Sequence, residues 1–273
     1  MKKKVFLFGL LFSLLLLCGC GVNLTSTVKL NKDFSGTRVM SCTFSSRDFN
    51  TYFNGSEKDL NKLIKESCPD ALTYTSSSTD GNDTYTFYLR FSSLDDYKKK
   101  VSDLLNFSPE ITYEYGDSPF VSGLIYKENF TSKDLMTWLY TALYEGKYID
   151  KDSSSDLWDL KSTKISFLGK TYETKDKINI DEMSYVSLSS IDIDTKTKDS
   201  GKLTRTIRFH IPQKTLDQNA GKIRSYFAEN DITWENTSDG KTLCISFDAN
   251  NFSDLAQKTR AVLHSKNSFG TYS

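Results

Sequence analysis

The fold is indicated first by the stretch Gly36-Thr37-Arg38-Val39-Met40-Ser41-Cys42-Thr43-Phe44, in which larger apolar residues alternate with polar ones. The same pattern returns 167 residues later as Leu203-Thr204-Arg205-Thr206-Ile207-Arg208-Phe209-His210-Ile211, where Arg205 takes the place of Arg38. Strict alternation places every second side chain on one face of a strand, so each stretch is typical of a half-buried β-strand. The recurrence suggests that part of the chain is duplicated.

Three further matched segments follow in the same order. Leu72-Thr73-Tyr74 matches Ile232-Thr233-Trp234 at an offset of 160 residues, and Asp80-Gly81 matches Asp239-Gly240 at an offset of 159. Phe87 and Leu89 match Ile245 and Phe247 at an offset of 158. A slow drift in offset is what small differences in loop length would produce. Chance recurrence of hairpins and helices is the alternative, but the common order favours duplication.

Two amphipathic helices are predicted in each copy, because apolar residues recur there at a spacing near 3.6. In the first copy the periodic residues of the two helices are Leu60, Leu63 and Ile64, and then Leu94, Tyr97, Val101, Leu104 and Leu105. In the second copy they are Leu216, Ala220, Ile223 and Phe227, and then Phe252, Leu255, Thr259, Val262 and Leu263. The predicted fold class is therefore α+β, with duplicated β-β-α-β-β-α units whose antiparallel sheets carry helices packed on one face.

The predicted organisation has five segments. They are a signal peptide (1–19), the first unit (20–106), a middle α+β region (107–182), the second unit (183–266) and a short tail (267–273). The middle region contains strands and a helix that begins near Ser132, where Thr131 and Asp134 have the spacing of a capping box. One interpretation of this region is a degenerate third unit.

The N-terminus has the order of a bacterial export signal. Lys2, Lys3 and Lys4 precede an apolar run, Val5–Leu17, that is too short to span a membrane comfortably. The following Leu17-Cys18-Gly19-Cys20 resembles the lipobox of bacterial lipoproteins, in which a Leu and a small residue precede an invariant Cys. Cys18 departs from the pattern, since that position is usually Ala, Ser or Thr.

This resemblance implies cleavage between Gly19 and Cys20 and attachment of diacylglycerol to the Cys20 thiol, with further acylation of its amine by a fatty acid such as palmitate. Two or three acyl chains anchor a protein stably where one is marginal. We therefore expect a lipid-anchored protein on the extracytoplasmic face of the cell membrane, in a Gram-positive bacterium. An uncleaved anchor helix and a fully secreted protein are the alternatives. The mature part also weakly resembles LppM-type mycobacterial lipoproteins, which begin a hairpin just after the lipidated Cys.

Charge and cysteine content narrow the function classes. Removing residues 1–19 takes away three of the 35 basic residues and none of the 35 acidic ones, so the mature chain is slightly acidic. Nucleic-acid binding is not expected, because it needs a basic surface. Cys42, Cys68 and Cys244 remain beyond Cys20. A Cys42–Cys68 disulfide is one prediction in an oxidising compartment, and Cys42 as a small buried hydrophobe is the other.

The sequence predicts no catalytic residue, metal site or cofactor. His210 and His264 are the two histidines, and neither lies in a recognised catalytic motif. Asp192 and Asp194 alternate with isoleucines and share one strand face, as the paired carboxylates of a glycosidase could, although a solvent-facing pair is the simpler interpretation.

The predicted function is that of a non-enzymatic binding or interaction module of the cell envelope. Its expected partners are membrane lipid, through acylated Cys20, and an envelope protein or glycan. Two alternatives are a solute-binding lipoprotein of a transporter and an envelope hydrolase that uses carboxylates.

Overall fold

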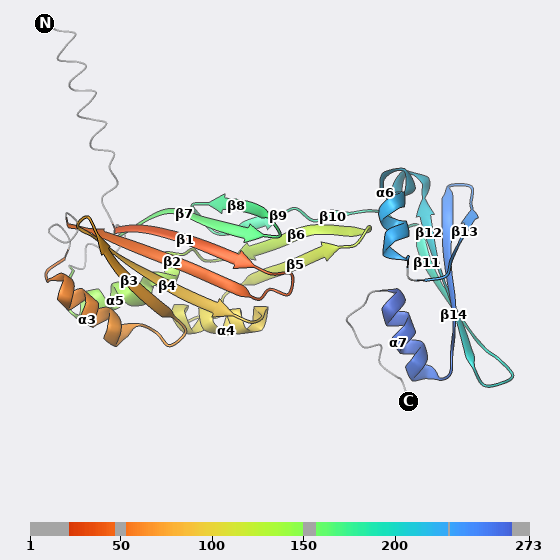
Figure 1. Ribbon diagram of the computed structural model, residues 1–273, viewed down its shortest axis with the longest axis horizontal. Coiled ribbons are helices and arrows are strands. Elements are labelled where there is room, and N and C mark those ends of the chain that lie inside the picture. Colours follow the sequence, from red (N-terminus) through yellow and green to blue (C-terminus); the bar gives the residue numbers. More distant parts are fainter. Residues whose placement is uncertain (1–21, 47–52, 150–156, 229, 264–273) are drawn as a thin grey trace, which may run out of the picture. The chain divides into compact units, whose positions relative to one another are not determined.

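The computed structural model describes residues 22–46, 53–149, 157–228 and 230–263. These residues belong to two compact units (Figure 1). Unit 1 lies within Met1–Glu114 and Ile125–Asp181, and unit 2 lies within Tyr115–Leu124 and Glu182–Ser273.

Unit 1 is built on a six-stranded sheet in the order β3-β4-β2-β1-β7-β8. The strands are β1 (Val22–Leu30), β2 (Gly36–Ser45), β3 (Thr73–Thr79), β4 (Asn82–Phe91), β7 (Trp158–Phe167) and β8 (Lys170–Thr174). All neighbours are antiparallel except β1 and β7, which are parallel. The Asp80-Gly81 turn joins β3 to β4 with positive φ at both residues, as a tight hairpin requires.

Helices cover one face of this sheet (Figure 1). They are α3 (Glu57–Ser67), α4 (Leu94–Leu105), the 3₁₀ helix η1 (Asp134–Met136) and α5 (Thr137–Glu145). The Ser56 and Ser93 hydroxyls accept hydrogen bonds from the first turns of α3 and α4, which fixes where those helices begin. Inward residues of β2, among them Met40 and Cys42, are fully buried beneath the helices.

A small second sheet is centred on β6 (Val121–Glu128), which pairs with β5 (Ile111–Asp117), β9 (Asn179–Asp181) and β10 (Ser184–Tyr185). Unit 2 contains a four-stranded antiparallel sheet in the order β11-β12-β14-β13. Its strands are β11 (Ser190–Thr197), β12 (Leu203–Pro212), β13 (Ile232–Asn236) and β14 (Gly240–Ala249). Helices α6 (Gln213–Tyr226) and α7 (Phe252–Val262) pack against β12 and β14.

The two copies share their element order and sheet order. β1-β2-α3-β3-β4-α4 matches β11-β12-α6-β13-β14-α7, and within each set of four strands the second and fourth lie between the other two. Arg38 lies opposite Leu89 in the first copy, and Arg205 lies opposite Phe247 in the second. The predicted α+β class, with antiparallel pairing and helices on one face, is confirmed.

Strand register refines the sequence alignment at one point. Tyr74 lies opposite Phe87, whereas Ile232 lies opposite Ile245. Ile232 therefore corresponds to Tyr74, and the offset there is 158 residues instead of 160. The parallel pairing of β1 with β7 was not predicted, because the pairing of two strands so far apart in the chain leaves no local turn signal.

Candidate functional site

A buried ion pair stands at the centre of unit 1. Arg38 on β2 is fully buried, and Glu128 at the end of β6 is 4% exposed. The Arg38 Nη1 atom lies 2.8 Å from the Glu128 Oε2 atom. The alternation of β2 turns Arg38 toward the helices, so a charged side chain occupies a position that its neighbours fill with apolar groups.

Four further hydroxyl groups surround this pair. The Glu128 Oε1 atom accepts hydrogen bonds from Tyr97 of α4, at 2.7 Å, and from Tyr126 of β6. The Arg38 Nη2 atom donates to Ser132 at 3.1 Å, and Ser132 is hydrogen-bonded in turn to Thr163 of β7 at 3.0 Å. Together these six residues are called the buried cluster: Arg38, Tyr97, Tyr126, Glu128, Ser132 and Thr163. The buried cluster joins β2, α4, β6 and β7.

The titration behaviour of the buried cluster follows from its geometry. Burial alone would lower the pKa of Arg38, but the nearby Glu128, Tyr97 and Tyr126 raise it above its usual value. Burial raises the pKa of both tyrosines, so their hydroxyls remain protonated and donate to Glu128. The cluster therefore holds one positive and one negative charge that compensate each other.

The buried cluster supports the floor of a groove. The Arg38 guanidinium carbon lies 5.6 Å from the centroid of the Phe130 ring, close enough for a cation–π interaction. Phe130 follows Glu128 by two residues and lines a groove of about 870 Å³ bounded by α3, α4 and α5. This volume lies within the range typical of small-ligand sites, roughly 300–1,000 Å³.

The lining combines apolar side chains with polar groups. Leu63, Leu104, Leu105, Phe107, Phe130, Trp138 and Ala142 supply apolar surface, and Ser67, Asn106, Asn129, Asp134, Thr137, Thr141, Glu145 and Lys177 supply hydrogen-bonding groups. Phe107 is 49% exposed and lines the groove, so it provides a ring that a ligand could cover.

Local structure sets the positions of these residues. Asn106 ends α4 in a left-handed conformation, with φ of 57°, and the chain then turns so that Phe107 lies at the groove. The predicted capping box is present: the Thr131 N–H donates to the Asp134 carboxylate at 2.7 Å, and the Asp134 N–H donates to the Thr131 hydroxyl at 3.5 Å. This box lies just before η1, which leads into α5. The Trp138 ring meets Phe87 edge to face, at 5.3 Å between centroids.

The groove is suited to an amphiphilic ligand of low net charge. Asp134 is already occupied as a helix cap, so Glu145 and Lys177 are the charged lining residues left, and their signs oppose. Aromatic rings beside amide and hydroxyl groups can bind a ligand that has both apolar faces and hydroxyl or amide groups.

A second polar arrangement lies on the sheet face of unit 2 away from its helices. His210 is hydrogen-bonded through Nε2 to Asp192 and through Nδ1 to Thr242, both at 2.8 Å, while Arg208 forms an ion pair with Asp194. The structure thus brings together His210 and the two aspartates noted in the sequence. They are bound across neighbouring strands, on a sheet surface, and do not line the unit 1 groove.

Carboxyl groups with a displaced pKa in the described residues are shifted downwards. The pKa values of Asp59, Asp96, Asp248 and Asp254 are lowered because these groups accept hydrogen bonds from Ser56, Ser92, Lys198 and Asn250 respectively. A general acid needs the opposite shift. In the described part of the chain, no group of three or more His, Cys, Asp or Glu residues could hold a metal ion.

The other predicted site residues are placed as follows. Gly19 and Cys20, the predicted cleavage and lipidation residues, lie outside the described residues. Cys42 and Cys68 are free thiols in this structure, so the predicted disulfide between them is not formed. Cys42 is fully buried in the core, and burial raises its pKa. None of the helices described is long and apolar enough to cross a membrane.

Comparisons with known proteins identify no family for this chain. No family model matches it, and no curated protein matches it. Among solved structures, it is similar to the NMR structure of the folded domain of LppM from Mycobacterium tuberculosis. The identity is 7% and the TM-score is 0.27, with 86% of this chain and 94% of that chain covered. A TM-score this low does not establish a shared fold.

The buried ion pair makes a stability prediction. Replacing Glu128 with Leu leaves the Arg38 charge buried without a carboxylate, so the free energy of unfolding should fall by about 3–5 kcal/mol. Urea-induced unfolding of the full chain measures this change. The double substitution Arg38→Met with Glu128→Leu should recover part of the loss, because neither charge then remains.

A matched control is available at the neighbouring residue. Lys127 forms an exposed ion pair with Asp181 at 2.7 Å, and Lys127→Ala should cost no more than about 1 kcal/mol. Equal losses for Glu128→Leu and Lys127→Ala would show that the buried pair has no special role.

Proposed function

We propose that this protein is a lipid-anchored binding module on the extracytoplasmic face of the bacterial cell membrane, and that the groove of unit 1 is its ligand site. The anchor is proposed from Leu17-Cys18-Gly19-Cys20, and the binding role from the groove. The single observation that carries the binding role is a groove of small-ligand size with exposed Phe107 at its edge.

The anchor would keep unit 1 close to the bilayer. β1 begins at Val22, two residues after Cys20. Two residues of extended chain span at most about 7 Å, so a lipid on Cys20 would hold the start of β1 near the membrane surface. The module would then meet ligands of the membrane-proximal envelope.

The chemistry of the groove favours a glycan over a folded protein partner. A stable protein interface buries roughly 800 Å² on each side and is usually broad, whereas this site is a bounded groove between three helices. Sugar rings have apolar faces that pack on aromatic side chains, and hydroxyls that pair with amides and carboxylates. Phe107 and Trp138 would supply the first kind of contact, and Asn106 and Glu145 the second.

The two alternatives have less support. A transporter-linked receptor is built from doubly wound lobes of parallel strands, whereas pairing in this chain is antiparallel apart from β1 with β7. A hydrolase using carboxylates would need an acid whose pKa is raised in a concave site. The shifted carboxyls described above are lowered and lie away from the groove.

Binding is predicted to depend on the exposed aromatic ring of the groove. Calorimetric titration of the full, detergent-solubilised protein with N-acetylglucosamine oligosaccharides should show saturable binding. Phe107→Ala should weaken it several-fold, since an aromatic contact is worth about 0.5–1.5 kcal/mol beyond the area it buries. Thr141→Trp should weaken it further by filling the groove.

Leu168→Ala is the matched control, because Leu168 is 53% exposed and does not line the groove. This variant should bind like the wild type. If the protein bound peptides and not oligosaccharides, the proposed ligand would be a protein and not a glycan. Equal affinity of the Phe107→Ala and Leu168→Ala variants for the oligosaccharide would show that the groove is not the binding site.

Anchoring is predicted to depend on Cys20 alone. In a host that processes lipoproteins, Cys20→Ala should yield a chain without the diacylglycerol mass increment. Cys18→Ala should be lipidated normally, because Ala is common at that position of a lipobox. Mass spectrometry of membrane and soluble fractions distinguishes these outcomes. An unmodified Cys20→Ala chain that stays in the membrane at wild-type levels would refute the lipid anchor.

A further inference from the structure

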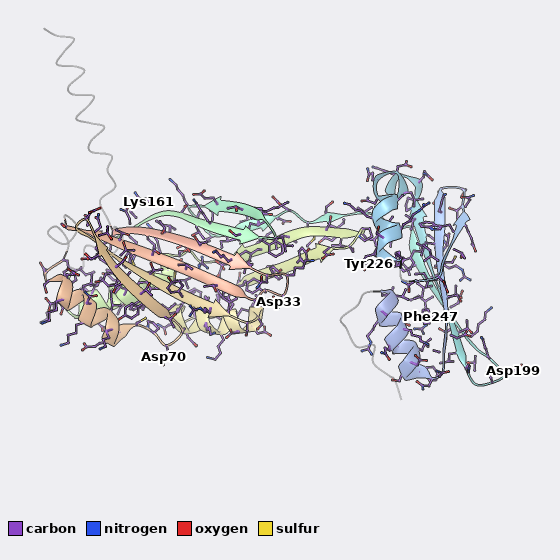
Figure 2. The ribbon with its side chains drawn as sticks, viewed as in Figure 1. Asp33, Asp70, Lys161, Asp199, Tyr226 and Phe247 are labelled. Atoms are coloured by element: carbon purple, nitrogen blue, oxygen red, sulfur yellow. The ribbon has the colours of Figure 1, made fainter. Side chains whose placement is uncertain are left out.

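The outer edge of β11 in unit 2 is open. β11 is the terminal strand of its sheet, and in the described part of the chain it pairs only with β12. All eight of its residues are exposed, including Ile191 at 45% and Ile193 at 48%. The strand continues into a hairpin whose tip contains Asp199 (Figure 2).

The equivalent edge in the first copy is occupied. β1 corresponds to β11, and its outer edge pairs with β7 along its whole length, from Val22 opposite Trp158 to Leu30 opposite Phe167. Strand register places Leu24 and Ser26 of β1 at the positions of Ile191 and Ile193. Leu24 is fully buried and Ser26 is 3% exposed. Among the residues that the structure describes, the second copy therefore has the same edge without a strand that covers it.

An uncovered edge of this length presents a row of backbone N–H and C=O groups that another strand can pair with. We propose that β11 pairs with β11 of a second copy of this chain, antiparallel, to form a continuous sheet across a two-fold axis at Thr195. This proposal does not depend on a ligand in the groove of unit 1.

Charge complementarity fixes the partner and the register. Asp192, Asp194 and Lys196 lie at every second position of β11 and share one sheet face, and Lys198 follows at the same spacing just after the strand ends. With the axis at Thr195, Asp194 lies opposite Lys196 of the second copy, and Asp192 lies opposite Lys198. Each pair occurs twice by symmetry, which gives four oppositely charged pairs and no like-charged pair. Directly opposed charges of opposite sign stabilise a strand pair.

Neighbouring registers lack this match. An axis at Asp194 would place that carboxylate against its own copy, and an axis at Ile193 would place Asp192 against Asp194. The existing contacts are compatible with the proposed register: Asp192 and Asp194 already accept hydrogen bonds from His210 and Arg208, and a carboxylate can accept several. Lys198 would exchange its present contact with Asp248, which is exposed.

Site-directed cross-linking in isolated membranes tests the dimer and its register together. Residues directly opposite in an antiparallel pair have Cα atoms about 4.5–5.5 Å apart, within the range that a disulfide can bridge. The background is the full chain with Cys68→Ser, because Cys42 and Cys244 are buried. Under mild oxidation, Thr195→Cys should give a covalent dimer on a non-reducing gel.

Ile193→Cys is the matched control, because in this register Ile193 faces Thr197 of the other copy and not itself. Alone it should not cross-link, whereas co-expression of Ile193→Cys and Thr197→Cys chains should produce a dimer. Adding Asp194→Lys to Thr195→Cys should reduce the dimer several-fold, and adding Lys196→Asp as well should restore it.

Three results would overturn the proposal. One is the absence of a dimer at every β11 position in chains that reach the membrane at wild-type levels. Another is stronger cross-linking of Ile193→Cys than of Thr195→Cys, which would show a different register. The third is a mixed disulfide of Thr195→Cys with another protein, which would assign the edge to a different partner.

Discussion

Burying the charges of Arg38 and Glu128 costs several kcal/mol for each ion, and the structure offsets that cost through their mutual contact and the hydroxyls around them. The buried cluster also connects elements that are distant in the chain. Arg38 comes from the central sheet, Tyr97 from α4 and Glu128 from the end of β6. The segment after Glu128 forms the groove floor at Phe130 and then leads into α5. The buried ion pair therefore links the central sheet to the elements that form the groove.

The two predicted copies differ in what residues 107–182 supply to the first one. Arg205 occupies the same register as Arg38, yet it donates to Thr195 at 3.0 Å and to Thr259 of α7 at 2.8 Å, and among the described residues it forms no ion pair like that of Arg38 with Glu128. Glu128, α5 and β7 all come from the middle region. That region completes unit 1 by supplying an ion-pair partner, a groove wall and the strand β7 that pairs with the outer edge of β1. The second copy keeps a simpler core and an open edge at β11.

Local features of the sequence predicted much of this fold. Alternation in residues 36–44 and 203–211 located the two central strands, and helical spacing located α4 and α7. The Thr131–Asp134 capping box was read correctly from its spacing. The parallel pairing of β1 with β7 and the meeting of Arg38 with Glu128 were missed, because both join residues far apart in the chain. One signal was present: an Arg at an inward position of an alternating strand requires a buried partner, although the sequence does not say which.

Amide hydrogen exchange in a Glu128→Gln variant of the full chain tests the central claim most directly. The claim is that the buried ion pair holds the groove helices on the unit 1 sheet. If the pair holds these helices, amide exchange should be faster in α4, at the end of β6 and in η1 and α5, and it should be unchanged in unit 2. Wild-type protection of α4 and α5 in this variant, or an equal loss of protection in α6 and α7, would contradict it.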